Sequence, residues 1–120
     1  AFTGCTFRMC FFDFSAMDSC DFSSSDIQFC SFAGCEIFNS SFENSEFVHN
    51  NFNGSRTREC TFNYSNLYNS RFIRSTFEAT DFVDCNMKKA FFLRTTEKEV
   101  SFKFSNTQEA LFDIAPEDEF

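Results

Sequence analysis

An apolar residue recurs at every fifth position along nearly the whole chain. Counting in steps of five from Phe2 to Phe112 gives 23 such centres, of which 20 are Phe, Ile, Leu or Met. The exceptions are Thr57, Glu97 and Thr107. A small residue precedes the centres by two positions: 20 of the 22 positions from 5 to 110 hold Cys, Ser, Thr or Ala. The register never slips, so no inserted loop interrupts the repeat.

A period of five excludes both a single helix and a flat strand. Five residues of an α-helix turn through about 500°, so successive centres would spiral around the helix axis. In a strand, a step of five residues reverses the face each time. The inward positions alternate between spacings of two and three residues, which indicates a short extended step followed by a corner. Such a unit cannot bury its own apolar face, so it must coil and stack on copies of itself.

The residue types at the centres indicate how many five-residue repeats make up one coil. With a period of 20, two columns of centres contain only Phe, namely positions 2, 22, 42, 62, 82 and 102 and positions 12, 32, 52, 72, 92 and 112. The other two columns are mixed. A four-sided coil with this period would place the two Phe columns on opposite walls. A period of ten explains the same alternation, so both interpretations stay open.

The repeat resembles that of the pentapeptide-repeat family, whose unit is usually written A(D/N)LXX with Leu or Phe at the centre. The resemblance covers residues 1–113 and implies an all-β fold, a right-handed four-sided β-helix of about five to six coils. Residues 114–120 would form a C-terminal tail. Asp or Asn precedes the centre in only a minority of repeats, such as Asp21 and Asn51. This departure is mild because that position faces outward.

Seven cysteines all occupy the small inward position of the repeat. They are Cys5, Cys10, Cys20, Cys30, Cys35, Cys60 and Cys85. Cys alternates there with Ser, Thr and Ala, so we interpret these residues as small and buried. Their odd number argues against a closed set of disulfides, and the sequence lacks the CxxC spacing that is typical of zinc sites. We expect reduced thiols, no metal and no cofactor.

No group of residues in the sequence points to catalysis. His49, the single histidine, falls at an outward turn position, and each Ser or Asp falls at a position that the repeat explains. A stacked rod also offers no obvious cleft. We therefore expect no catalytic residue and a non-catalytic protein-interaction module that presents rigid walls to a macromolecular partner. A structural spacer within a longer chain is a further hypothesis.

The net charge of −8 comes from 18 acids and 10 bases. It argues against direct nucleic-acid binding, which needs clustered bases, although an acidic surface also serves solubility. Residues 1–55 carry seven acids and one base. In the middle of the chain, the four-sided arrangement stacks Arg56 on Glu36 and places Glu78 between Arg58 and Lys98.

The family resemblance implies an alternative function. Some members, notably the quinolone-resistance group, resemble a DNA duplex in shape and charge and act on DNA gyrase. The alternative is therefore a DNA-mimicking modulator of DNA gyrase or another type II topoisomerase, with candidate contacts at Asp21, Asp26, Glu43 and Glu46. Duplex DNA carries one charge per about 1.7 Å. Eight net charges on a rod of roughly 27 Å reach about half that density, which favours the interaction module.

The C-terminal region leaves two structures open. Residues 95–120 either complete a sixth coil, which the register of Phe102 and Phe112 favours, or place a short helix from 107 to 114 across the open end. Apolar residues on one wall near this end are candidates for a cap or a homodimer contact, and family members often pair through this end. These candidates are Phe91, Leu93, Leu111 and Ile114. Phe11 and Phe14 lie on the same wall at the other end.

The sequence contains no apolar run that approaches the length of a membrane span. We expect a cytoplasmic protein that does not contact a membrane. Ala1 and Phe2 already lie in the repeat register, so the sequence leaves open whether a segment is missing before them.

Overall fold

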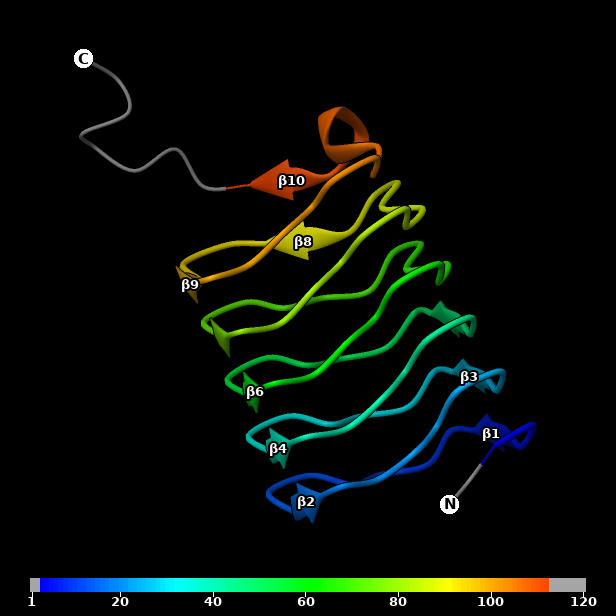
Figure 1. Ribbon diagram of the computed structural model, residues 1–120. Helices are drawn as coiled ribbons and strands as arrows, with labels where there is room; N and C mark the ends of the chain where they lie inside the picture. The colour runs from blue at the N-terminus through cyan, green and yellow to red at the C-terminus, as the bar shows by residue number, and fades with distance from the viewer. Residues whose placement is uncertain (1–2, 113–120) are drawn as a thin grey trace.

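The repeat winds into a parallel β-helix in which four repeats make one coil. The computed structural model describes residues 3–112 (Figure 1). Successive coils pair in parallel and in register, with Thr6 opposite Asp26 and Ala16 opposite Glu36. Paired residues are thus 20 residues apart, which is the longer of the two periods that the sequence allowed. This confirms the four-sided coil.

Short strands mark the walls of the coil. They are β1 (Thr6–Arg8), β2 (Ala16–Asp18), β3 (Asp26–Gln28), β4 (Glu36–Phe38), β5 (Glu46–Val48), β6 (Arg56–Arg58), β7 (Thr76–Glu78), β8 (Phe91–Phe92), β9 (Thr96–Lys98) and β10 (Leu111–Phe112). A 3₁₀ turn, η1 (Thr107–Glu109), is the only helical element among the described residues. The strands are short because a corner follows each centre. Within residues 3–112, no helix is long and apolar enough to cross a membrane.

We name the four walls A to D. Wall A comprises residues 21–24, 41–44, 61–64, 81–84 and 101–104. Wall B carries β1, β3 and β5 and comprises residues 6–9, 26–29, 46–49, 66–69, 86–89 and 106–109. Wall C carries β8 and β10 and comprises residues 11–14, 31–34, 51–54, 71–74, 91–94 and 111–112. Wall D carries the sheet β2-β4-β6-β7-β9 and comprises residues 16–19, 36–39, 56–59, 76–79 and 96–99 (Figure 1).

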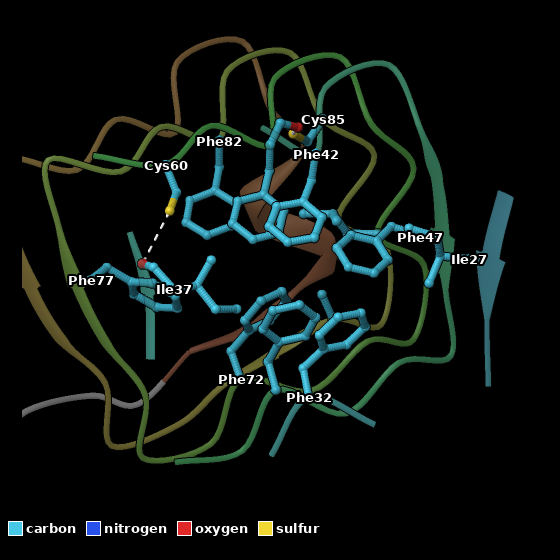
Figure 2. Packing of buried hydrophobic residues seen from close by; sticks show 14 of the residues in the cluster. Ile27, Phe32, Ile37, Phe42, Phe47, Cys60, Phe72, Phe77, Phe82 and Cys85 are labelled. Atoms are coloured by element: carbon cyan, nitrogen blue, oxygen red, sulfur yellow. Dashed lines mark hydrogen bonds between the residues drawn. The ribbon is translucent and has the colours of Figure 1, made fainter. Parts of the chain in front are cut away.

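The two Phe columns form two stacks of rings that face each other across the core (Figure 2). On wall C the rings of Phe32 and Phe52 are stacked with centroids 4.6 Å apart, and on wall A those of Phe42 and Phe62 are stacked at 4.9 Å. Across the core, Phe42 meets Phe52 edge to face at 86°. Both arrangements are favourable for aromatic pairs. The predicted opposition of the two columns is confirmed.

The small inward residues connect coils through hydrogen bonds. The Ser65 hydroxyl donates to the Phe42 carbonyl at 2.7 Å and accepts the Ser45 N–H at 3.1 Å. A thiol also donates in this position, since Cys60 Sγ lies 3.3 Å from the Ile37 carbonyl oxygen (Figure 2). Every buried side-chain nitrogen or oxygen within residues 3–112 has a hydrogen-bond partner. The small position is therefore a polar column that satisfies buried backbone groups.

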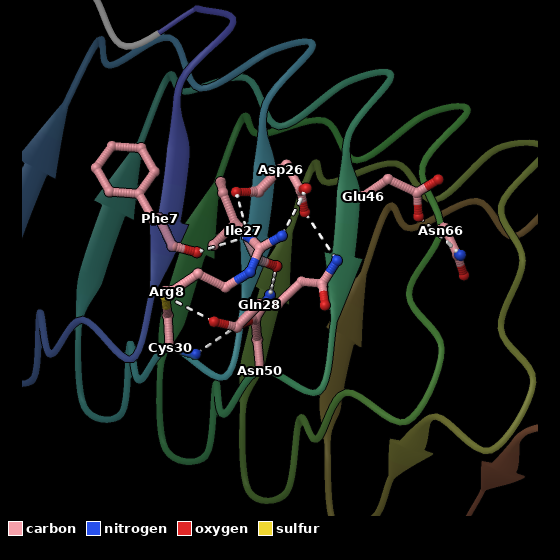
Figure 3. Close-up of polar contacts among 9 residues, drawn as sticks. All are labelled: Phe7, Arg8, Asp26, Ile27, Gln28, Cys30, Glu46, Asn50 and Asn66. Atoms are coloured by element: carbon pink, nitrogen blue, oxygen red, sulfur yellow. Dashed lines mark hydrogen bonds and ion pairs between the residues drawn. The ribbon is translucent and has the colours of Figure 1, made fainter.

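Exceptions to the repeat pattern find partners in neighbouring coils. Thr57 is buried at a centre, and its hydroxyl lies 2.9 Å from that of Thr80. Asn50, at a small position, accepts the Cys30 N–H at 2.9 Å (Figure 3). Glu97, at a centre of wall D, is exposed, and its carboxylate accepts the Thr95 hydroxyl. A polar residue is thus tolerated inside where a partner lies one coil away, and a charged one where the side chain reaches water.

Every corner residue adopts the left-handed backbone conformation. Each position from 4 to 104 that follows a centre by two has a positive φ, and only three of these positions hold glycine. This conformation costs an L-residue about 1–2 kcal/mol, so the rest of the coil must impose it. The left-handed corners were not predicted from the sequence. The signal was the enrichment of residues that tolerate the conformation, namely Gly4, Gly34, Gly54, Asn39, Asn44 and Asn69.

The last coil continues the β-helix as far as Phe112, the last described residue. Leu111 of β10 pairs with Phe91 of β8, and its N–H donates to the Ala90 carbonyl at 2.8 Å. The alternative, a short helix from 107 to 114, is wrong as far as Phe112. The only helical turn in this segment up to Phe112 is η1, and after it the pairing of β10 with β8 holds the chain extended. Ile114 and the expected tail at 114–120 lie outside the described residues.

Candidate partner-binding face

The four walls differ in charge. Walls D and A, which are neighbours, carry ten acids and four bases, and wall B carries three of each. Wall C has three bases, Arg71, Arg74 and Arg94, and a single acid, Asp13. One half of the β-helix is therefore acidic and the other half is neutral to basic.

The four candidate acids do not form one cluster. Asp21 and Glu43 lie on wall A, where Glu43 accepts the Thr61 hydroxyl at 3.1 Å. Asp21 accepts the Ser23 N–H at 2.9 Å, and hydrogen bonds from Ser23 hold the pKa of Asp21 below its ordinary value. The two candidate carboxylates on wall A are therefore already hydrogen-bonded within the protein.

Asp26, on wall B, is neutralised by a base of the preceding coil. Arg8 donates to its carboxylate at 2.7 Å, and Gln28 donates to the other oxygen at 2.8 Å (Figure 3). The hydrogen bond from Arg8, followed by that from Gln28, lowers the pKa of Asp26. The ion pair of this candidate contact was not predicted from the sequence, because Arg8 lies almost one whole coil earlier in the chain. The fold brings the two charges together.

Glu46 ends a ladder of asparagines on wall B. Asn66 donates to the Glu46 carboxylate at 2.9 Å (Figure 3). Asn86 donates to the Asn66 carbonyl at 2.9 Å, and Asn106 donates to Asn86 at 3.0 Å. The ladder explains why this outward column contains polar amides in successive coils: each amide can both donate and accept along the axis.

The two arginines of wall D are paired with acids of the same wall. Arg56 lies 3.9 Å from Glu36, as predicted, and Arg58 lies 3.7 Å from Glu78. Lys98 is opposite Glu78 in register, and the ion pair of Glu78 is with Arg58. Exposed pairs of this kind contribute only about 0–1 kcal/mol. They do, however, leave wall D without a free basic patch.

Exposed large apolar side chains gather on wall C and its corners. Seven such side chains occur within residues 3–112: three of them lie on wall C, and two more lie at the end of wall B that adjoins it. These five are Met9 (72% exposed), Phe11 (79%), Phe14 (83%), Phe29 (52%) and Leu111 (51%). The other two, Tyr64 and Phe104, lie on wall A. An exposed apolar cluster is a typical mark of a contact surface.

Three of the four candidate cap or dimer residues lie on the C-terminal part of wall C. Leu111 is exposed, whereas Phe91 and Leu93 are half-buried. Leu111 covers Phe91 in register through the pairing of β10 with β8. The fourth candidate, Ile114, lies outside the described residues. Wall C thus has apolar side chains near both ends, with arginines between them.

A hollow of about 310 Å³ lies between the N-terminal apolar cluster and the arginines. Its lining consists of Phe11, Phe29, Cys30, Ser31, His49, Asn51 and Arg71. The floor is a column of paired residues in which Ser31 and Asn51 separate Phe11 from Arg71. The side is formed by the rings of Phe29 and His49, which are stacked with centroids 4.7 Å apart. The repeat predicted His49 at an outward turn but did not predict this stack.

The thiols and acids do not assemble into a metal site in the part of the chain that the structure describes. All seven cysteines are free, and four are buried while Cys5, Cys10 and Cys20 are partly exposed. Burial raises the pKa of the Cys85 thiol to about 11. The groups that wall C presents are apolar side chains, amides and arginines.

Comparison with known proteins agrees with this architecture. The family model for pentapeptide repeats (8 copies) matches residues 58–92. No curated protein matches the sequence significantly. The structure is similar to Rfr23, a pentapeptide repeat protein from the cyanobacterium Cyanothece 51142, with a TM-score of 0.73 at 13% identity over 78% of this chain and 64% of that one. Residues 58–92 therefore match the pentapeptide-repeat family, and the fold of residues 3–112 is similar to that of solved pentapeptide-repeat structures.

A second similar structure is a trypsin-treated variant of QnrB1, a plasmid-mediated fluoroquinolone resistance protein. Its TM-score is 0.51 at 12% identity over 89% of this chain and 77% of that one. At these identities both similarities concern the fold alone. The matched part spans less than two thirds of the length of Rfr23.

Proposed function

We propose that the chain is a non-catalytic protein-interaction module and that wall C is the face that binds its partner. The observation that carries this proposal is the concentration of exposed apolar side chains on wall C and its corners. Phe11 and Phe14 are each about four-fifths exposed, at 79% and 83%. Burying them against a partner would gain about 25 cal/mol for each Å² of apolar surface removed from water.

The scaffold supports this role because it is rigid. Each coil is tied to the next by parallel backbone bonds, and the Phe stacks and small-residue hydrogen bonds run through the core. A surface that is already ordered loses little conformational entropy on binding. Wall C is therefore preorganised as a contact surface.

The test places a photo-cross-linking phenylalanine analogue at position 11 of wall C or at position 104 of wall A. Both positions carry an exposed Phe, so Phe104 (76% exposed) is a matched control. In cells of the source organism, we expect position 11 to cross-link to a defined partner protein and position 104 not to. Phe11→Ser with Phe14→Ser should abolish co-purification of that partner, whereas Phe104→Ser should not. Equal cross-linking from both positions would contradict the proposal.

A second candidate is modulation of DNA gyrase by DNA mimicry. The observation that favours it is the acidic half of the β-helix, where walls D and A carry ten acids. Asp21 and Glu43 belong to this half, whereas Asp26 is paired with Arg8 on wall B.

A supercoiling assay separates the two candidates. If the chain is a gyrase ligand, it should alter supercoiling at micromolar concentration, and reversal of Asp21, Asp26, Glu43 and Glu46 to Lys should abolish the effect. No effect of the unmodified protein would reject the second candidate and leave the first unchanged.

A further inference from the structure

From the hollow on wall C we infer the chemistry of the partner: an extended acidic protein segment with a large apolar side chain four residues from a carboxylate. The apolar side chain packs against Phe11 and Phe29, and the carboxylate pairs with Arg71. This inference rests on the proposed function, because it presupposes that wall C is the binding face.

The spacing follows from the column that forms the floor of the hollow. Phe11, Ser31, Asn51 and Arg71 are paired in successive coils, so Phe11 and Arg71 are three coils apart. Neighbouring strands lie about 4.8 Å apart, which makes the separation roughly 14 Å. An extended segment that runs along the axis advances about 3.3 Å per residue. It therefore covers this separation in about four residues.

The hollow presents hydrogen-bond donors at its basic end. Arg71 is exposed and makes no ion pair with any residue from 3 to 112. Asn69 Nδ2 donates to His49 Nδ1 at 2.8 Å, which places the ring proton of a neutral His49 on Nε2. Asn51 Oδ1 accepts the Asn53 N–H at 2.8 Å, so its NH₂ group remains the donor. A carboxylate is the side chain that accepts from arginine and amide donors together.

The surroundings of the hollow favour an acidic protein segment over nucleic acid. None of the seven lining residues is an acid, and Arg74 on the same wall adds a second exposed base. The three arginines of wall C are too few to neutralise a run of phosphates, and the protein as a whole carries a net charge of −8. The apolar end, formed by Phe11 and Phe29, requires a hydrophobic side chain next to the charge.

The experiment uses the full chain and fluorescein-labelled synthetic peptides, with binding measured by fluorescence anisotropy. Each peptide has one Phe and one Asp in a background of Ala and Ser, with the Asp two, four or six positions from the Phe. We expect the spacing of four to bind most tightly. Arg71→Glu should weaken binding of this peptide about threefold to tenfold and make a peptide with Lys in place of Asp the better ligand.

Matched variants separate a local contact from a general effect. Arg56→Glu, on wall D, reverses another exposed arginine and should leave binding unchanged. Phe11→Ser should weaken the Asp and Lys peptides alike. Equal binding of the Asp and Lys peptides to the unmodified protein would overturn the inference, as would equal losses with Arg71→Glu and Arg56→Glu or tighter binding of single-stranded DNA.

The chain itself has a segment of the inferred kind. Residues 113–120 read DIAPEDEF, in which Ile114 and Asp118 have the spacing of four. A synthetic peptide of this sequence that binds more tightly than the best designed peptide would overturn the assignment of the hollow to a different protein. Cross-linking from position 11, combined with peptide binding that does not depend on charge, would refute this inference and leave the proposed function standing. If position 11 gives no cross-link and peptide binding does not depend on charge, the inference and the proposed function are both refuted.

Discussion

The hydroxyl oxygens of Thr57 and Thr80 lie 2.9 Å apart in the core, and Thr80 in turn donates to the Glu78 carbonyl at 3.1 Å. Thr57 is therefore the donor to Thr80. This relay allows a polar residue to occupy a centre between Ile37 and Phe77 on wall D.

Thr80→Val should destabilise the protein more than Thr57→Val. The first change leaves the buried Thr57 hydroxyl without its partner, at a cost of about 1–3 kcal/mol. The second leaves Thr80 bonded to Glu78 and should cost less than about 1 kcal/mol. Urea unfolding measures both, and the double variant should be more stable than Thr80→Val alone. Simple addition of the two single effects would contradict the relay.

Ala79→Gly and Ala90→Gly should change stability in opposite directions. Ala79 is a corner residue with φ of 49°, so glycine relieves backbone strain there and should stabilise by up to about 1 kcal/mol. Ala90 is fully buried at a small inward position, so glycine removes a packed methyl group and should destabilise by about 1 kcal/mol. Thermal unfolding of the two variants gives the comparison. Destabilisation of equal size would show that the corners are not strained.

The seven thiols should fall into two classes of reactivity. Burial raises the pKa of Cys30, Cys35, Cys60 and Cys85, so less of the reactive thiolate forms at these four, and burial also limits access of the reagent. We expect Cys5, Cys10 and Cys20 to react first with Ellman's reagent in the native protein, and about seven thiols to react after denaturation without reductant. Uniform rapid reaction of all seven, or missing thiols after denaturation, would contradict this expectation.

We predict a homodimer through Phe91, Leu93, Leu111 and Ile114. Of these, Leu111 has half of its surface exposed, at 51%, and its backbone is held by Ala90. Leu111→Asp should therefore disrupt the contact without unfolding the coil, whereas Phe104→Asp on wall A should not. Sedimentation at tens of micromolar measures the mass. A measured mass of 14.0 kDa, that of the monomer, that Leu111→Asp does not change would contradict the prediction.

The coil could be predicted from the sequence because its information is local and repeated. Phe32, Phe52 and Phe72 recur at a constant spacing, and stacking them in register is the arrangement that buries every member of the column. The same pattern identified the cysteines as inward residues. The pairing of Arg56 with Glu36 followed directly from the period, because the two residues are one coil apart.

The candidate site could be predicted only in part. Phe11 and Phe14 were placed on the correct wall, since wall membership depends on position in the repeat alone. The stack of Phe29 on His49 and the bond from Asn69 could not be foreseen, because they depend on how side chains leave a left-handed corner.

The five-residue repeat and its inward and outward positions are therefore properties of the sequence, since apolar residues at a constant spacing must be buried together. The choice between coil periods of ten and 20 residues was made by the pairing of successive coils, such as Thr6 with Asp26. The tertiary structure decided the rest: that Asp26 is neutralised by Arg8, that Thr57 finds Thr80, and that Arg71 remains without an ion pair among the described residues. These outcomes depend on distances and side-chain directions between neighbouring coils. A one-dimensional pattern carries the register of the coils but not those directions.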